Sequence, residues 1–151
     1  MSNLKIPKKI HQIWIGDRSK RPQEFMNSWI EKHPDWEYML WTEENIPKLI
    51  NYKHFVATYR LSGKANIVRY ELLYRYGGVY IDADARCLNR LDEFFLENES
   101  FAGWENELRR PGLVANGLMG ATKENPLIKK LIDGISQLDA DRLADPILSP
   151  T

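Results

Sequence analysis

The chain has 151 residues, of which 43% are hydrophobic and 28% are charged, so it is large enough for one domain with a buried core. Its 21 basic and 21 acidic residues balance, which excludes an acidic disordered chain and a basic nucleic-acid-binding protein. The only cysteine, Cys87, excludes a disulfide framework and a cysteine-based zinc site, and we expect it to be a structural thiol.

The sequence shows no sign of a membrane-spanning or exported segment. No stretch approaches the roughly 18 consecutive apolar residues that a spanning helix needs. The first nine residues lack the apolar centre of a signal peptide. We therefore expect no transmembrane segment and a location in the cytoplasm, either free or at the periphery of a membrane.

The N-terminal half alternates between the patterns of strands and helices. The predicted elements are a strand at 10–15, a helix at 25–30, a strand at 36–41 and two short helices at 46–50 and 55–61. Gly16-Asp17 is expected to end the first strand, and Ser62-Gly63 is expected to end the last helix.

The clearest helix is predicted at 64–76. Ala65, Val68, Leu72 and Tyr76 form an apolar stripe along it, and the pair Gly77-Gly78 is a typical terminator. A strand is predicted to begin directly after this pair, at Val79.

The alternation continues in the C-terminal half. We predict a helical segment at 91–96, short strands at 101–104 and 118–121, and a helix that begins after Asn125-Pro126. The inward side of that last helix is expected to consist of Ile128, Leu131, Ile132, Ile135 and Leu138. From Asp139 onward the pattern is weak. Alternating strands and helices, without a repeat or a linker, predict a single α/β domain over 1–151.

Two carboxylates follow the strand that begins at Val79. Side chains alternate along a strand, so Tyr80, Asp82 and Asp84 are expected on one face. Paired acidic oxygens suit a hard cation, Mg²⁺ or Mn²⁺, which takes its remaining ligands from water and substrate phosphates. The plainer interpretation is a polar strand end that leads into a turn.

Three further side chains are candidates for the same site. Asn66 and Arg69 are one helical turn apart, so both are expected to share a cleft with the acidic pair, where a guanidinium can orient a phosphate. Trp14 ends the first predicted strand, where an indole can stack on a base. The structural alternatives are an ion pair for Arg69 and a core position for Trp14.

Other chemistries lack their motifs. The chain has no dinucleotide-binding or P-loop glycine pattern, no clustered histidines and no serine-nucleophile elbow. Asp82 and Asp84 are too close in sequence for the two carboxyl groups that flank a scissile bond in glycoside hydrolysis. Divalent-metal phosphoryl or nucleotidyl transfer is an alternative that uses a similar acidic pair, although the neighbouring residues match it poorly.

Several segments together resemble one known family. They are 6–16 (IPKKIHQIWIG), Ser28-Trp29, 33–38 (HPDWEY), 69–84 (RYELLYRYGGVYIDAD) and 116–121 (NGLMGA) followed by Asn125-Pro126. In this order they resemble the DXD-containing glycosyltransferases of family 32. That family includes bacterial capsular and lipopolysaccharide sugar transferases, fungal initiating mannosyltransferases and, more distantly, clostridial glucosylating toxins.

The resemblance implies a GT-A fold and a metal-dependent, retaining hexosyl transfer from a UDP- or GDP-linked sugar to a glycan or glycolipid acceptor. It implies that Asp84 binds Mn²⁺ or Mg²⁺ directly and that Asp82 bridges to the ribose or, through water, to the metal. Arg69 would face the phosphates or the sugar, Trp14 would stack on the base, and Tyr80 would line the donor site.

Two departures from the family pattern carry expectations of their own. Asn66 stands where the family usually has an aspartate that contacts donor hydroxyls, so we expect weaker or altered donor binding. Members of the family also continue through a C-terminal stretch that completes the metal and acceptor sites, so we expect a fragment or a minimal member. A non-catalytic remnant that binds nucleotide sugars is therefore an alternative function.

Overall fold

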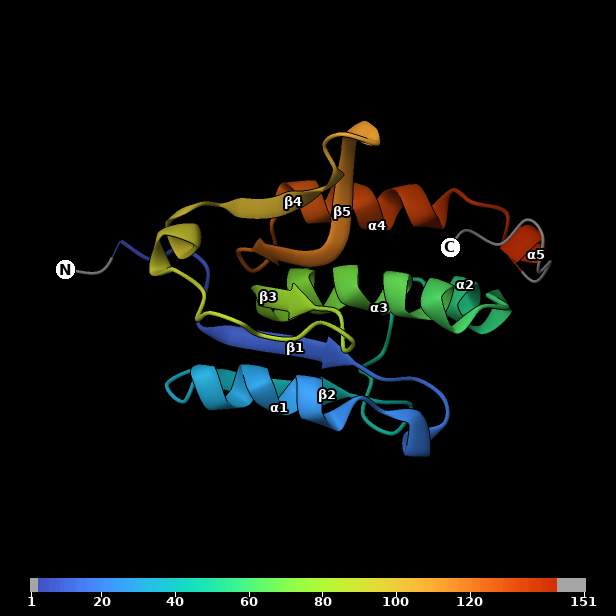
Figure 1. Cartoon of the computed structure of the whole chain (residues 1–151). Coiled ribbons are helices and arrows are strands. Elements are labelled where there is room, and N and C mark those ends of the chain that lie inside the picture. The colour runs from blue at the N-terminus through green and yellow to red at the C-terminus, as the bar shows by residue number, and fades with distance from the viewer. Residues whose placement is uncertain (1–2, 144–151) are drawn as a thin grey trace.

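A computed structural model describes residues 3–143 of the chain, and its centre is a five-stranded mixed sheet (Figure 1). The strand order is β2-β1-β3-β5-β4. The strands are β1 Lys9–Ile13, β2 Glu37–Trp41, β3 Gly78–Ile81, β4 Ser100–Asn106 and β5 Arg110–Ala121. The first three run parallel, whereas β5 is antiparallel to both β3 and β4. The predicted α/β class is confirmed.

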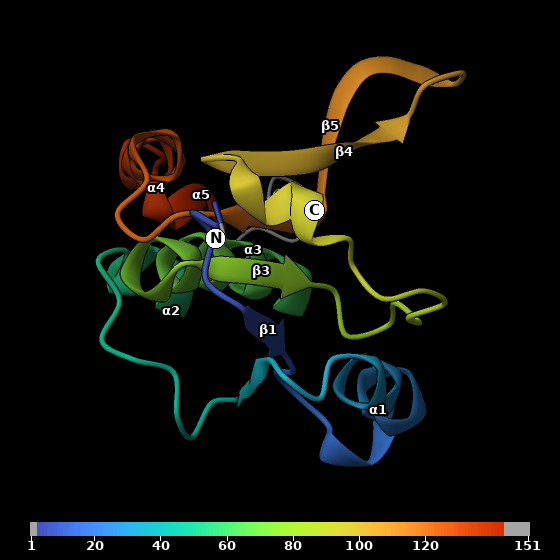
Figure 2. The ribbon, with the colours of Figure 1, turned by 90° about the vertical axis from the view of Figure 1, so that its left-hand side faces the viewer.

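Helices cover both faces of the sheet, and each face has its own core. The helices are α1 Gln23–Lys32, α2 Tyr52–Ala57, α3 Leu61–Tyr76, α4 Pro126–Ser136 and α5 Ala140–Leu143, with 3-10 turns η1 Arg18–Lys20 and η2 Glu93–Glu97. On one face α3 and α4 pack around Ile13, Tyr80 and Met119. On the other face α1 and η2 pack around Ile10 and Val79. Figure 2 shows α1 and α4 on opposite sides of the strands. Within the described residues no helix is long and apolar enough to cross a membrane.

The passage from α3 into β3 needs glycine twice. Gly77 and Gly78 have φ angles of +67° and +115°, which disfavour residues with a side chain. A Cβ on Gly78 would lie 2.7 Å from the carbonyl oxygen of Lys9 in β1, so even the smallest side chain would collide with backbone. The predicted terminator is thus confirmed, and it brings the chain from a partly buried helix straight into a fully buried strand.

Two helix predictions in the first half are wrong. Residues 46–50 form an irregular segment, because the buried Glu71 carboxylate takes the amides of Ile50 and Asn51 that a helix would use. The helix predicted at 55–61 lies earlier, at α2. Ser62-Gly63 is no terminator, since Gly63 is buried inside the first turns of α3 and packing outweighs its low helix propensity.

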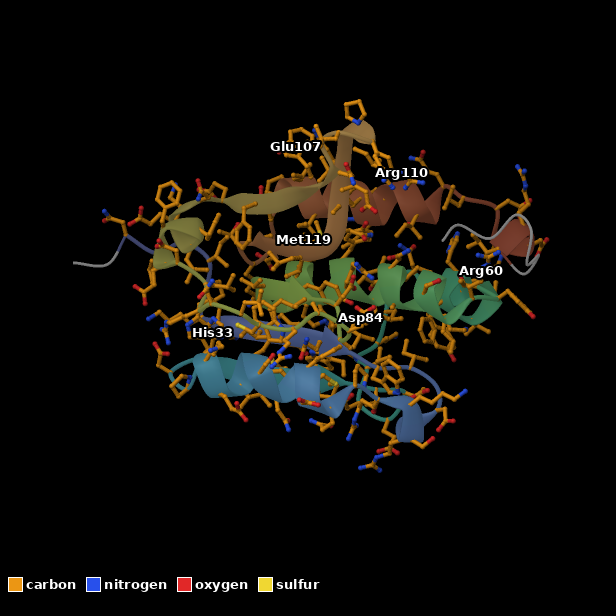
Figure 3. All side chains as sticks on the ribbon, viewed as in Figure 1. His33, Arg60, Asp84, Glu107, Arg110 and Met119 are labelled. Atoms are coloured by element: carbon orange, nitrogen blue, oxygen red, sulfur yellow. The ribbon has the colours of Figure 1, made fainter. Side chains whose placement is uncertain are left out.

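The second half also differs from its predictions in detail. The strands at 101–104 and 118–121 belong to the much longer β4 and β5, which extend into an exposed hairpin whose far end carries Glu107 and Arg110 (Figure 3). Leu138 lies beyond the end of α4 and is 47% exposed, so its predicted inward position is wrong. The segment at 91–96 is the 3-10 turn η2. Residues 140–143 of the weakly patterned tail are helical, and 144–151 lie outside the described residues.

Candidate functional site

A cleft of about 660 Å³ opens where β1 and β3 end. Its floor carries Arg69 from α3, Tyr80 from β3 and the acidic pair Asp82 and Asp84 that follows β3. Trp14, directly after β1, forms part of its wall. The carboxyl ends of parallel strands are where α/β folds bind their ligands, so the topology itself places the candidate residues together.

The Asp82 carboxylate is held in place by the two neighbours on the cleft floor. The Tyr80 hydroxyl donates a hydrogen bond to Asp82 Oδ1 at 2.9 Å, and Arg69 Nη2 lies 3.3 Å from the same oxygen. The guanidinium carbon of Arg69 is 4.4 Å from the centre of the Tyr80 ring. The three side chains therefore form one unit, which we call the Asp82 cluster.

Burial dominates the electrostatics of the Asp82 cluster. It raises the pKa of Asp82 above its usual value, and the nearby charge of Arg69 offsets only part of that effect. Burial also raises the pKa of Tyr80, so its hydroxyl stays protonated and continues to donate. The side chain of Arg69 is only 6% exposed, and its buried Nε has no hydrogen-bond partner. A guanidinium with unused donor capacity therefore lies beside the cleft.

Strand β5 closes the Asp82 cluster from the other side. Arg69 Nη1 donates to the carbonyl oxygen of Asn116 at 2.5 Å, and the Asp82 amide donates to the carbonyl oxygen of Gly117 at 2.8 Å. A Cβ on Gly117 would lie 2.6 Å from Asp82 Oδ2. The carboxylate therefore occupies the space that a side chain at 117 would fill. Sequence reasoning missed this contact, because no local pattern links residues 35 positions apart.

Asp84 contrasts with Asp82. Strand β3 ends at Ile81, so the pair stands on the turn that follows the strand rather than on the strand as predicted. Asp84 is exposed at the cleft, and within residues 3–143 it makes no hydrogen bond or ion pair. Its two oxygens are available to a ligand, whereas Asp82 Oδ1 is already engaged.

The donor set at this turn fits a hard cation. Its atoms are carboxylate oxygens, which Mg²⁺ and Mn²⁺ prefer. In the part of the chain that the structure describes, no three acidic, histidine or cysteine side chains gather closely enough to enclose a metal ion. A cation here would therefore complete its coordination with water and with oxygens of a substrate.

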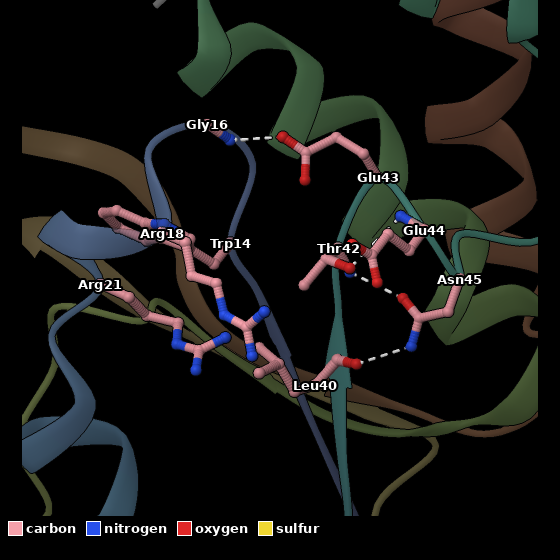
Figure 4. A pocket seen from close by; sticks show the side chains of 9 residues that line it. All are labelled: Trp14, Gly16, Arg18, Arg21, Leu40, Thr42, Glu43, Glu44 and Asn45. Carbon is pink, nitrogen blue, oxygen red and sulfur yellow. Dashed lines mark hydrogen bonds between the residues drawn. The ribbon is translucent and has the colours of Figure 1, made fainter.

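Trp14 lines both the cleft and a second pocket of about 340 Å³. Figure 4 shows this second pocket from close by. Its indole Nε1 donates to the carbonyl oxygen of Asp17 at 2.9 Å, which fixes the ring at the edge of both spaces. The second pocket is lined on one side by Arg18 and Arg21 and on the other by Leu40 of β2 and by the residues that follow this strand, namely Thr42, Glu43, Glu44 and Asn45. Sequence reasoning did not single out these charged residues, since only their position after adjacent strands marks them.

Asn66 does not line the cleft. It lines a neighbouring pocket of about 280 Å³ together with Tyr70 and Asn116. Asn116 Nδ2 donates to Asn66 Oδ1 at 3.2 Å and to the Tyr70 hydroxyl at 3.0 Å. Of the groups expected to share one cleft, Arg69, Asp82 and Asp84 do so, while Asn66 is connected to them only through Asn116.

Comparison with known proteins gives consistent results. Residues 19–101, more than half of the chain, match the family described as the glycosyltransferase sugar-binding region containing a DXD motif. An inositol phosphoceramide mannosyltransferase of Schizosaccharomyces pombe is 33% identical over 136 residues, which are 84% of this chain and 36% of that protein. A mannosyl phosphorylinositol ceramide synthase of Saccharomyces cerevisiae is 33% identical over 142 residues, 86% of this chain and 35% of that protein.

A solved structure supports the fold. The PaToxG glycosyltransferase superposes with a TM-score of 0.66 at 20% identity, over 95% of this chain and 67% of that one. The GT-A-like architecture expected from the sequence is thereby confirmed. The chain spans about a third of the length of the curated relatives described above.

Proposed function

The chain belongs to the family of glycosyltransferases with a DXD-containing sugar-binding region, and from that membership we propose that it transfers a hexose from a nucleotide sugar to a glycan or lipid-linked acceptor. The observation that carries the proposal is the cleft, where a restrained Asp82 and an open Asp84 lie beside Arg69. We further propose that residues 1–151 form one GT-A-type domain, and that transfer is metal-dependent and retains the anomeric configuration, as in the family that the sequence resembles.

Asp84 is the proposed direct ligand of Mn²⁺ or Mg²⁺. Its oxygens are uncommitted, while Asp82 is positioned to contact the ribose or a metal-bound water, because Tyr80 and Arg69 already hold Oδ1. When bound, the cation supplies positive charge that stabilises the departing nucleoside diphosphate without a proton transfer.

Arg69 is proposed to orient the donor phosphates or the sugar. Its carbonyl contact at Asn116 and its packing on Tyr80 fix the guanidinium before a ligand arrives, so little side-chain freedom is lost on binding. The cluster thus has the rigidity that positioning a diphosphate requires.

The donor base is proposed to stack on Trp14, whose ring is fixed by its bond to Asp17. A base at this position would have its edge near the charged pocket of Arg18, Arg21, Glu43 and Glu44. Whether the donor carries uracil or guanine would then depend on that pocket, since both bases offer a face for stacking and differ at their edges.

Asn66 is proposed to contact donor hydroxyls from the neighbouring pocket. Its Oδ1 accepts a hydrogen bond from Asn116, so the contact would use the rest of its amide group. The same observation favours the alternative function, a domain that binds nucleotide sugars without turnover. An amide outside the cleft replaces the carboxylate that the family usually has, and this change weakens a contact to the transferred sugar.

The acceptor is proposed to be lipid-linked. The relatives described above are named for mannosyl transfer to inositol phosphoceramide or for synthesis of its mannosylated product, and both products are glycolipids. Because the chain covers about a third of those proteins, the proposal concerns the acceptor class alone.

Calorimetric titration with UDP-sugars and GDP-mannose, with and without Mn²⁺, tests the proposal. We expect metal-dependent binding that Asp84→Ala abolishes and that the matched variant Asp133→Ala, on the exposed side of α4, leaves unchanged. Binding followed by product formation from an inositol phospholipid would establish transfer. Binding without product would support the alternative, and no binding by the folded chain would contradict both.

A further inference from the structure

Two segments meet at the mouth of the cleft. They are the loop at 16–22 and the corner at 58–62 between α2 and α3, and we call their joint surface the cleft rim. Leu61 lines the cleft, and its Cδ1 lies 2.9 Å from where a Cβ on Gly16 would stand, so the two segments touch. Figure 3 shows Arg60 on this corner, at the end of α3 remote from the Gly77 turn.

The loop side of the rim presents positive charge. Arg18 and Lys20 are exposed, and within residues 3–143 neither forms a salt bridge. The one acidic residue of the loop, Asp17, accepts hydrogen bonds from the amide and hydroxyl of Ser19 and keeps its negative charge. Glu43 and Glu44 face Arg18 across the second pocket, but the loop at 16–22 itself carries three basic residues, Arg18, Lys20 and Arg21, against the one aspartate.

The corner continues this charge along α2. Residues 45–70 contain no aspartate or glutamate, and their basic residues are Lys48, Lys53, Arg60, Lys64 and Arg69. Arg69 is buried against Asp82 and does not add to the surface charge. The next acidic residue, Glu71, is buried and accepts from the amides of Ile50 and Asn51, so it does not neutralise the surface. Lys48 and Lys53 are exposed.

Large apolar and aromatic side chains stand among these cations. Tyr59 and Leu61 on the corner are 63% and 51% exposed, and Tyr52 and Val56 on α2 are 61% and 57% exposed. Tyrosines and aliphatic side chains mixed with lysines and arginines are the composition of surfaces that lie at the headgroup level of a bilayer. Carboxylates would be repelled by an anionic bilayer, and this stretch of the chain lacks them.

We propose that the cleft rim and the adjoining surface of α2 dock onto an anionic phospholipid membrane. The inference rests on the proposed function, which includes a lipid-linked acceptor. Docking of this surface would bring such an acceptor to the mouth of the donor cleft. The lysines at the opposite end of the parallel strands support the choice of surface. Lys5, Lys8 and Lys9, which lie before or at the start of β1, are all paired with glutamate or aspartate.

Vesicle co-sedimentation of the 151-residue chain tests the inference without donor, acceptor or turnover, so its outcome is independent of the proposed function. The probes are phosphatidylcholine vesicles with and without phosphatidylserine. The test variant is Arg18→Ala/Lys20→Ala/Lys53→Ala, and the matched control Lys5→Ala/Lys9→Ala/Lys129→Ala removes the same charge from salt-bridged positions. Circular dichroism checks folding, and Lys53→Glu alone serves if the triple variant does not fold.

We expect binding to the phosphatidylserine vesicles only, weakened by salt. The test variant should bind about 100-fold more weakly, since each cation near an anionic surface contributes about tenfold or less, while the control stays within about threefold. Tyr59→Ser should weaken binding further. Equal binding of test and control variants, or no binding by the unmodified chain, would overturn the proposal, as would self-association in light scattering that leaves the vesicles free.

Discussion

Arginine and aspartate pair at both ends of the parallel strands, and the two pairs differ in their surroundings. Before β2, Arg90 holds Asp35 through two bonds of 2.6 and 2.8 Å, but both side chains are well exposed. After β3, Arg69 approaches Asp82 only to 3.3 Å, yet the arginine is 6% exposed. The better geometry thus belongs to the pair that water screens more strongly.

The two pairs also shift the pKa of their aspartates in opposite directions. Hydrogen bonds from Arg90 lower the pKa of Asp35, whereas burial raises the pKa of Asp82 despite Arg69. In the pair of Arg90 and Asp35, the two charged groups are bound to each other at the surface. The pair of Arg69 and Asp82 lies in a partly buried cleft, where both groups can interact with a ligand.

The largest expected effect comes from filling the space that Asp82 occupies. Gly117→Ala should displace the carboxylate from Arg69 and Tyr80, since the new Cβ would lie 2.6 Å from Oδ2. We expect nucleotide-sugar binding to weaken about 100-fold, as misplacing a positioning group by about 1 Å typically does. Calorimetry measures the change. The matched control is Gly134→Ala in α4, where nothing lies within 4 Å of the new methyl group and binding should be unaltered.

Removing one partner of the buried pair should destabilise the chain. Asp82→Ala leaves the Arg69 guanidinium without a counter-charge, and we expect a loss of about 2 kcal/mol in the free energy of unfolding, below the range for fully buried pairs because Asp82 is 39% exposed. Urea denaturation measures it. An unchanged midpoint would show that solvent already compensates Arg69.

The pH dependence of stability should separate the two aspartates. The lowered pKa of Asp35 gives stability that is present above its usual value of 3.8 and is lost as pH falls through the folded pKa. The raised pKa of Asp82 acts the other way, so its contribution improves as pH falls from above the folded pKa toward 3.8. Unfolding of Asp35→Asn and Asp82→Asn in chelator-containing buffer should therefore differ from the parent with opposite slopes. Slopes of the same sign would refute the assignment.

The smallest effect is expected at the exposed pair. Arg90→Ala should lower the free energy of unfolding only slightly, and less at high salt, since screened surface ion pairs contribute little. Thermal unfolding in low and high salt measures it. A loss as large as that of Asp82→Ala would contradict the contrast between the two ends of the sheet.

Much of this arrangement is predictable from local pattern. Periodicity and the glycine pair locate β1, α1, β2, α3 and β3, and the strand ends then bring Trp14, Arg69, Asp82 and Asp84 to one cleft. The position of Asn66 is less predictable. Asn66 and Arg69 are three residues apart on α3, so their side chains differ by about 60° in direction, which is enough for them to line two different pockets. The roles of Gly117 and Glu71 depend on contacts distant in sequence, which no window of the chain reveals.

The loop-free passage from α3 through Gly77-Gly78 into β3 also determines where the chain can vary in length. Arg69 and Asp82 are separated by a helix end, two glycines packed against Lys9 and Pro7, and a buried strand. An inserted residue there would shift one partner of the ion pair relative to the other. The exposed hairpin end at 107–109 has no such constraint, so evolutionary insertions should accumulate there while the spacing from 69 to 82 stays fixed.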